Sequence, residues 1–220
     1  MDSDQANVKS DITSFFASFP KQSFSVGAMI LTPDDTGRDV YFLASGRVKM
    51  FVYSESGSQV VFHILGPGMY FPLCLLFGSR GSTMYYHQAF SAVVVHRCPA
   101  ESARAFFQKN PPLVASLCFR LWQGIEGLTR RLETGLTQPV PVQTTRLLVY
   151  MVKHFGEKGK NGNSIIRGFT HQEIADWLGT TRETVSLRME QLKRKRILSY
   201  QSGTITVHSL RRLEHLAEAS

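Results

Sequence analysis

The stretch FTHQEIADWLGTTRETVSLRMEQLKRKRI, residues 169–197, decides the fold of this chain. Its apolar residues recur at helical steps on either side of a break at residues 179–181. Gly179 stands where a glycine ends a helix, and Thr181 stands where a threonine begins the next one. The pattern predicts two short helices joined by a tight turn. Such a pair is either a helix-turn-helix, whose second helix enters a DNA groove, or a plain helical hairpin with a basic end.

The positive charge of the chain is concentrated in its last third. The 220 residues contain 25 Lys and Arg and 17 Asp and Glu, which gives a net charge of +8. Residues 146–220 hold thirteen of the basic and seven of the acidic residues, an excess of six. A basic C-terminal region behind a nearly neutral one is typical of a DNA reader attached to another domain. This distribution favours the helix-turn-helix.

The cysteines and the first residues indicate a reducing compartment. Cys74, Cys98 and Cys118 are far apart and form no CxxC pair, so the sequence offers no metal motif and we expect no metal site. The first residues are polar and acidic, unlike a signal peptide. The longest nearly apolar stretch, residues 69–78, is too short to span a bilayer. We expect a cytoplasmic protein that does not enter a membrane.

Residues 24–98 have the pattern of short strands separated by glycine-containing turns. Apolar and polar residues alternate over residues 48–53 and again over residues 60–65, with a hairpin turn between them at residues 54–58. Frequent turns of this kind predict a small barrel or jelly roll. Residues 99–110 then read as a short helix.

A longer helix follows, and its apolar residues repeat at steps of three and four, close to the heptad of a coiled coil. This spacing predicts a dimerisation helix, although the same face could instead lie on the chain's own roll. Pro139 and Pro141 then place a break at residues 137–141. The predicted dimer positions are Leu113, Leu117, Leu121, Ile125, Leu128, Leu132 and Leu136.

After the break, a helix over residues 144–155, a polar loop over 156–164, the two helices and a strand pair over 197–207 form the order of a winged helix. The predicted fold class is therefore α+β. It consists of an N-terminal double-stranded β-helix (jelly roll), a long helix and a C-terminal winged helix-turn-helix domain.

With these parts in order, the chain resembles the CRP/FNR family of bacterial transcription regulators. Residues 170–207, beginning THQEIADWLGTTRETVS, match the family's helix-turn-helix and wing, and YFLASGRV at 41–48 and the turn at 66–68 match its roll. The resemblance implies a cyclic-nucleotide-binding-like effector domain at 1–111, a dimerisation helix at 112–138 and a DNA-binding domain at 139–220. It implies a homodimer on near-palindromic double-stranded DNA, and RNA polymerase as a partner if the protein is an activator.

The roll departs from the cyclic-nucleotide binders of that family. Pro72 and Leu73 stand where they have Gly-Glu, and Thr83 and Met84 stand where they have Arg-Ser; Arg80 lies three residues too early. A buried cyclic phosphate would lack its charged partners, so cyclic AMP is not the expected effector. The family's pocket positions instead carry mostly apolar and aromatic residues. They are Met50, Phe62, Leu65, Phe71, Leu73, Thr83, Tyr85, Tyr86, Leu128 and Thr129.

These positions predict a small apolar or aromatic effector of unknown identity. Two alternatives stay open within the family: a roll filled by its own side chains, and a haem or redox sensor that uses His87. Outside it, a cupin-type metalloenzyme would need clustered histidine ligands, and the seven histidines include no His-x-His pair. A DNA-architectural protein without a regulatory role is a further rival. Because the sequence has no clustered metal ligands and resembles a family of regulators, we expect a regulator and not an enzyme.

The second helix also departs from the family, which usually has TVSR followed by an apolar residue. Here Leu187 takes the place of the arginine and Arg188 the place of the apolar residue. By the resemblance, the base-reading residues are Arg182, Glu183, Ser186, Leu187 and Arg188, with Leu187 against a thymine methyl group. The predicted phosphate contacts are Thr170, Gln172, Thr181, Lys193 and Lys195.

Overall fold

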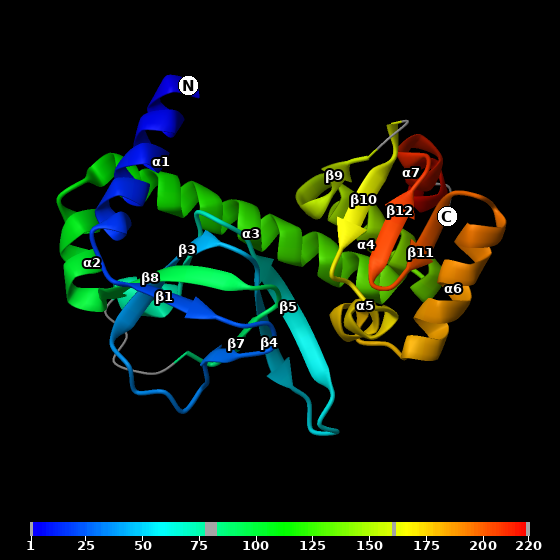
Figure 1. The fold of residues 1–220 in the computed structure, drawn as a ribbon, viewed down its shortest axis with the longest axis horizontal. Coiled ribbons are helices and arrows are strands. Elements are labelled where there is room, and N and C mark those ends of the chain that lie inside the picture. Colours follow the sequence, from blue (N-terminus) through cyan, green and yellow to red (C-terminus); the bar gives the residue numbers. More distant parts are fainter. Residues whose placement is uncertain (1, 78–82, 160–161, 219–220) are drawn as a thin grey trace. The chain divides into compact units, whose positions relative to one another are not determined.

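Figure 1 shows the fold in a computed structural model that describes residues 2–77, 83–159 and 162–218. The chain forms two compact units, one from residues 1–53 and 61–126 and the other from residues 54–60 and 127–220. The long helix α3 (Pro111–Thr137) contributes its first part to the N-terminal unit and the remainder to the C-terminal unit. A β-sheet domain, a long helix and a helix-turn-helix follow one another, which confirms the predicted fold class.

The N-terminal unit is a roll of two four-stranded sheets, with the strand orders β1-β8-β3-β6 and β2-β7-β4-β5. Gly46 connects β3 to β4 with a φ of +85°, and a Cβ there would collide with the backbone of Ala92 and Val93. Only glycine fits this turn. The elements are α1 (Asp2–Ala17), β1 (Lys21–Phe24), β2 (Met29–Leu31), β3 (Asp39–Ser45), β4 (Val48–Tyr53), β5 (Gln59–Leu65), β6 (Tyr70–Phe71), the 3-10 helix η1 (Leu73–Phe77), β7 (Tyr86–Ala89), β8 (Val93–Pro99) and α2 (Ala100–Gln108).

Two apolar cores hold this unit together. The inner core fills the roll between its sheets and includes Leu43, Leu65 and Phe71. The outer core joins β3 and β6 to the helices α1, α2 and α3, and includes Phe16 of α1. The ring of Phe16 stacks on Phe42 at 5.0 Å between centroids. The helix α1 did not stand out in the sequence, where the first residues were identified only as polar.

The C-terminal unit is a winged helix. Its sheet has the order β11-β12-β10-β9, and α4 packs against α7 and the helix-turn-helix. The predicted break after the long helix is confirmed: α3 ends at Thr137, and Gln138 and Pro139 lie between it and α4. The elements are α4 (Val140–Phe155), β9 (Glu157–Lys158), β10 (Ser164–Arg167), α5 (His171–Leu178), α6 (Arg182–Arg194), β11 (Leu198–Gln201), β12 (Thr204–Val207) and α7 (Leu210–Glu218).

Three features of this unit differ from the prediction. The helix α4 starts four residues earlier than expected, since Pro139 serves as its N-cap and proline is tolerated in a first turn. Short strands β9 and β10 lie partly in the segment predicted as a loop, and α7 was not predicted. In the part of the chain that the structure describes, no helix has the length and apolar character needed to cross a bilayer.

Candidate nucleic-acid interface

Local capping interactions build the helix-turn-helix, and those at Gly179 and Thr181 are the ones that the sequence predicts. The Thr170 hydroxyl accepts a hydrogen bond from the backbone N–H of Glu173 at 3.2 Å, and the Glu173 carboxylate accepts one from the backbone N–H of Thr170 at 2.7 Å. Gly179 ends α5 in the left-handed region at φ 65°, and Thr181 caps α6 through the backbone N–H of Thr184 at 3.3 Å. These caps satisfy backbone groups that helix ends leave open. They therefore set where α6 begins.

The second helix, α6, has one buried face and one exposed face. Val185, Met189 and Leu192 are fully buried and fix the helix on the unit's core. Arg182 and Glu183 in the first turn are exposed, and Leu187 is 65% exposed. Three of the five predicted base-reading residues thus lie on the outer face.

The other two predicted base-reading residues are held by hydrogen bonds within the chain. Ser186 Oγ lies 2.9 Å from Nδ1 of His171. The Arg188 guanidinium donates from Nε and Nη2 to the Thr145 hydroxyl of α4, at 3.2 and 2.9 Å. The Arg188 side chain is thus engaged with Thr145 of α4, and its role as a base-reading residue stays a prediction. Neither Thr145 nor His171 was singled out in the sequence, since both act across helices.

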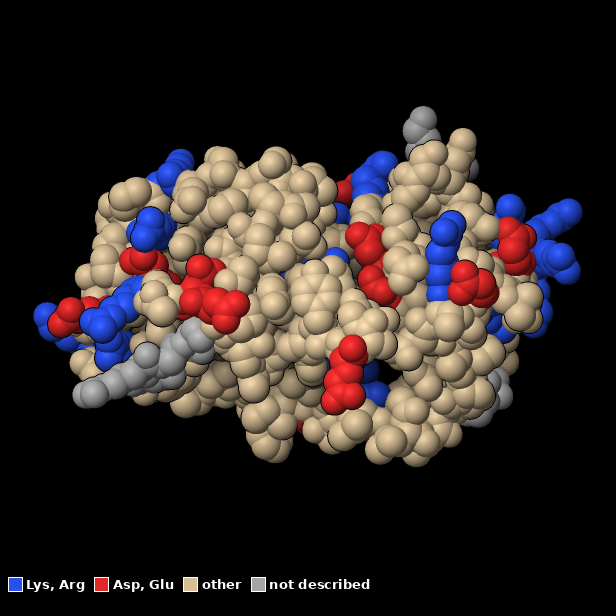
Figure 2. Space-filling view, turned by 90° about the horizontal axis from the view of Figure 1, so that it is seen from below, with Lys and Arg blue, Asp and Glu red and all other residues tan. Residues whose placement is uncertain are grey.

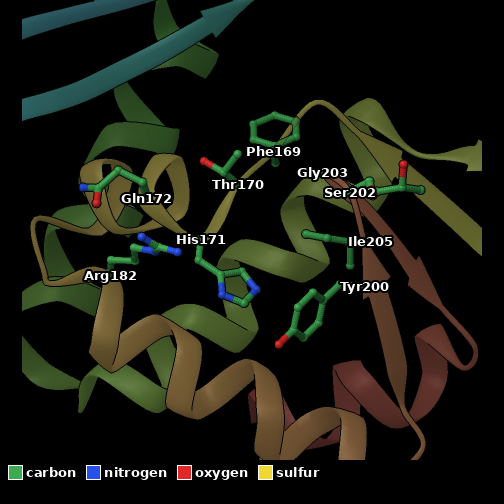
Figure 3. Close-up of a pocket in the computed structure, with 10 residues that line it drawn as sticks. Phe169, Thr170, His171, Gln172, Arg182, Tyr200, Ser202, Gly203 and Ile205 are labelled. Carbon is green, nitrogen blue, oxygen red and sulfur yellow. The ribbon is translucent and has the colours of Figure 1, made fainter.

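A pocket of about 410 Å³ opens between the start of the helix-turn-helix and the wing (Figure 3). His171 and Tyr200 lie side by side in it, edge to face at 4.5 Å between ring centroids. Burial, and secondarily the charge of Arg182, lowers the pKa of His171, so its neutral form is favoured. The residues that line the pocket are Phe169, Thr170, His171, Gln172, Arg182, Tyr200, Ser202, Gly203, Thr204 and Ile205.

A short polar chain links this pocket to the basic end of α6. The Tyr200 hydroxyl donates to the Glu190 carboxylate at 2.6 Å, and Lys193 lies 3.6 Å from the same carboxylate and above the Tyr200 ring. The hydrogen bond from Tyr200 is the main reason why the pKa of Glu190 is lowered. The wing is thereby tied to α6.

The residues predicted to contact phosphate differ in whether their side chains are already engaged within the chain. The Thr170 and Thr181 hydroxyls serve as helix caps, and Gln172 donates to Asp176 at 2.7 Å. Lys193 and Lys195 are exposed within the basic run 193–196. Figure 2 shows Lys and Arg side chains projecting at the end of the view where Figure 1 places α6.

The predicted effector residues of the roll lie in its two cores and on neighbouring strands. Leu65 and Phe71 are buried in the inner core, Phe62 meets Tyr85 at 5.3 Å between ring centroids, and Leu73 packs against the outer core instead. Leu73 is the first residue of η1, directly after β6 and Pro72, and its part in an effector site stays a prediction.

The remaining predicted effector positions lie on β4, just before β7 and on it, and on α3. Thr83 is buried and its hydroxyl accepts from the backbone N–H of Tyr85 at 3.2 Å; Tyr86 stacks on Phe51, and Met50 is half-buried. Leu128 and Thr129 are exposed and belong to the C-terminal unit. Arg80 lies outside the described residues.

His87, the candidate haem ligand of the sequence, is a buried histidine on β7. Its ring stacks on Phe71 at 5.0 Å, and among the described residues its Nδ1 has no hydrogen-bond partner. Burial lowers the pKa of His87 from 6.5 to about 4. Within the same residues, no three His, Cys, Asp or Glu side chains gather as a metal site would require.

The predicted dimer positions on α3 divide into two groups. Leu113 and Leu117 are buried in the chain's own outer core, and Leu121 packs partly against it. These two buried leucines are removed from the predicted dimer surface, since their own roll covers them. The rest of the helix exposes large apolar side chains on the same side, which are Trp122, Ile125, Leu128, Leu132 and Leu136.

Comparison with known proteins agrees with this geometry. Residues 144–216 match the Crp-like helix-turn-helix domain, and residues 21–110 match the cyclic nucleotide-binding domain. The global nitrogen regulator of Nostoc sp. (strain PCC 7120) is 28% identical over 188 residues, which cover 85% of this chain and 84% of that protein. Transcriptional regulator SdrP of Thermus thermophilus is 28% identical over 199 residues, 90% of this chain and 94% of that protein.

A solved structure gives the same result. The crystal structure of a CRP/FNR-family transcriptional regulator from Thermus thermophilus has a TM-score of 0.74 and 26% identity, covering 90% of this chain and 98% of that one. Fold and site together define a DNA-binding transcription regulator of the helix-turn-helix class, not an enzyme. More specifically, the chain belongs to the CRP/FNR family.

Proposed function

We propose that this protein is a homodimeric regulator that reads one near-palindromic DNA sequence through the outer face of α6. The observation that carries the proposal is the division of α6 into a fully buried face and a face that presents Arg182, Glu183 and Leu187. Glu183 would accept a hydrogen bond from a cytosine amino group, and Arg182 would donate to a guanine or a neighbouring phosphate. Leu187 would lie against a thymine methyl group, where the family's arginine would read guanine.

Contacts to the DNA backbone would set the register of the helix in the groove. The exposed Lys193 and Lys195 supply charge at the end of α6. Thr170, Gln172 and Thr181 lie at the starts of α5 and α6, where backbone N–H groups and the helix dipole favour an anion. Since these side chains are already engaged in caps or with Asp176, and the Thr170 N–H donates to Glu173, the backbone amide of Gln172 in the first turn of α5 is the better donor.

The dimer would form through the exposed apolar residues of α3. Ile125, Leu132 and Leu136 are 56%, 63% and 79% exposed, and large apolar side chains at this spacing match a two-helix seam. A two-fold dimer places its two recognition helices about one helical turn of DNA apart. We keep residues 1–111, 112–138 and 139–220 as the effector domain, dimer helix and DNA-binding domain of a cytoplasmic regulator.

Selection from random duplex DNA, followed by competition, tests the DNA-reading function. The full-length protein should enrich a near-palindrome and bind it at least about a thousandfold more tightly than unrelated DNA at physiological salt. Equal affinity for the selected site and unrelated DNA would instead favour an architectural protein.

For the effector, we propose a largely apolar molecule and not cyclic AMP. Leu73 and Thr83 replace the carboxylate and guanidinium that a cyclic nucleotide would need, and the roll places Phe62 against Tyr85. Native mass spectrometry of the protein from its own host should show a retained small molecule. Micromolar affinity for cyclic AMP in calorimetry, lost on Arg80→Ala, would contradict this. A haem sensor remains the second candidate because of His87, and a Soret band would identify it.

A further inference from the structure

The guanidinium of Arg188 is engaged between α6 and α4. Besides the two hydrogen bonds to Thr145, its Nη1 donates to Gln191 Oε1 at 3.2 Å. Three of the five N–H donors of the group are therefore used within the chain. Arg188 is half-buried, and this burial lowers the pKa of its guanidinium.

The acceptor of these bonds, the Thr145 hydroxyl, has no capacity left. Thr145 is fully buried, and its Oγ donates to the carbonyl of Pro141 at 2.8 Å while it accepts from Nε and Nη2 of Arg188. One donor and two acceptor sites are all that a hydroxyl offers. The orientation of a buried hydroxyl that makes all of its hydrogen bonds is held in place, because any rotation would leave a polar group unpaired.

The position of Arg188 makes this contact consequential for DNA binding. It follows Leu187 directly, so it projects about 100° away from the outer face of α6, towards the side of the helix that packs on α4. In a docked recognition helix, residues beside the outer face are those that meet the phosphates on the groove wall. An arginine on this flank, if released, would add a contact that is blind to sequence.

We propose that Thr145 is a specificity-determining positioning residue, which withholds Arg188 from the DNA backbone by binding its guanidinium along α4. The proposal rests on α6 being the recognition helix. With Arg188 held, discrimination depends on Arg182, Glu183 and Leu187, and the affinity for unrelated DNA stays low. Removal of the hydroxyl would leave a partly buried cation without its main acceptor, and the side chain would turn outward to water or phosphate.

The salt dependence of binding to an unrelated duplex tests this, because each neutralised phosphate adds about 0.9 to the slope of log affinity against log salt. The full-length variants are Thr145→Val, which removes the hydroxyl but keeps the shape, Thr145→Ser as the matched control, Arg188→Met, and the double variant Thr145→Val with Arg188→Met. Circular dichroism and the fluorescence of the buried Trp177 check that each variant is folded.

We expect Arg188→Met and Thr145→Ser to keep the wild-type slope and Thr145→Val to steepen it by about 0.9, so that affinity falls about threefold more between 50 and 200 mM salt. The double variant should return to the wild-type slope. An unchanged or shallower salt slope for Thr145→Val would overturn this inference but not the proposed function. A salt slope reduced by about 0.9 in Arg188→Met would also overturn this inference. That result can be obtained even if Thr145→Val fails to fold. Wild-type protein that binds no DNA would contradict the proposed function itself.

Discussion

The C-terminal unit exposes three of its five predicted base-reading residues on a single helix, whereas the predicted effector residues of the N-terminal unit come from several strands and from η1. Arg182, Glu183 and Leu187 share the outer face of α6. In the roll, Phe71 lies in the inner core and Leu73 in the outer one, although only one residue separates them. A site on one capped helix is set by helical periodicity, which is local. A site in a roll depends on how several strands pair, and strand pairing joins residues that are far apart in the sequence.

Breaking the dimer should have the largest effect on the C-terminal unit. We expect the double change Ile125→Asp and Leu132→Asp to give monomers, since charge on this exposed apolar face opposes association without entering a core. Affinity for the near-palindrome should fall by roughly a hundredfold or more, because the two half-sites no longer bind as one. Analytical ultracentrifugation and anisotropy titration measure the two effects.

The matched control is Arg130→Glu, an exposed charge change on the same helix outside the apolar set. It should leave the protein dimeric. A double Asp variant that stays dimeric would show that α3 does not form the dimer.

Acid should weaken the roll through His87, which gives the N-terminal unit a signature of its own. The folded pKa of about 4 lies below the unfolded value near 6.5. The unfolded chain therefore binds a proton that the folded chain does not, and stability falls as the pH drops from about 6.5 to 4, by about 3 kcal/mol in total. Below that window this loss is complete.

The change His87→Phe should remove this part of the pH dependence, because the ring still stacks on Phe71 but cannot titrate. Urea unfolding at the two ends of the window, compared with wild type, measures the difference. The exposed His215 on α7, changed to Gln, serves as a surface control. Equal pH dependence in wild type and His87→Phe would mean that His87 is accessible to protons in the folded roll.

Two glycines in the C-terminal unit should respond to alanine with opposite signs. Gly179→Ala forces a side chain into the left-handed turn at φ 65° and should destabilise the unit by about 1–2 kcal/mol. Gly135→Ala, in the helix α3 with nothing within 4 Å of the new Cβ, should stabilise it by up to about 1 kcal/mol. Fluorescence of Trp177 during urea unfolding, in variants that also carry Trp122→Phe, follows this unit. Equal signs would show that the turn between α5 and α6 is not built as described.

The smallest expected effect concerns the basic end of α6. Lys195→Ala should lower the salt slope on any duplex by about 0.9 and leave base preference unchanged, if this exposed lysine meets a phosphate. Lys158→Ala, an exposed lysine on β9, is the comparison. A changed base preference in Lys195→Ala would place this residue at the base edges instead.

Much of the fold was predictable because its signals are local. The caps Thr170 and Thr181, the turn glycine Gly179 and the alternation of β4 are each legible within a few residues. The contacts of Arg188 with Thr145 were not, since they join residues 43 positions apart across two helices. The same holds for the helix α1, whose largely polar sequence gains its place through Ile12, Phe15 and Phe16 in the outer core.

The central claim is that the outer face of α6 reads the operator, and selection from random DNA with wild type and Glu183→Ala in parallel tests it most directly. Wild type should yield a near-palindrome with half-site centres about 10 base pairs apart. The variant should yield the same motif with preference lost at one symmetric pair of positions, a cost of about 1–3 kcal/mol each. An identical motif from both proteins, or none from wild type, would contradict the account.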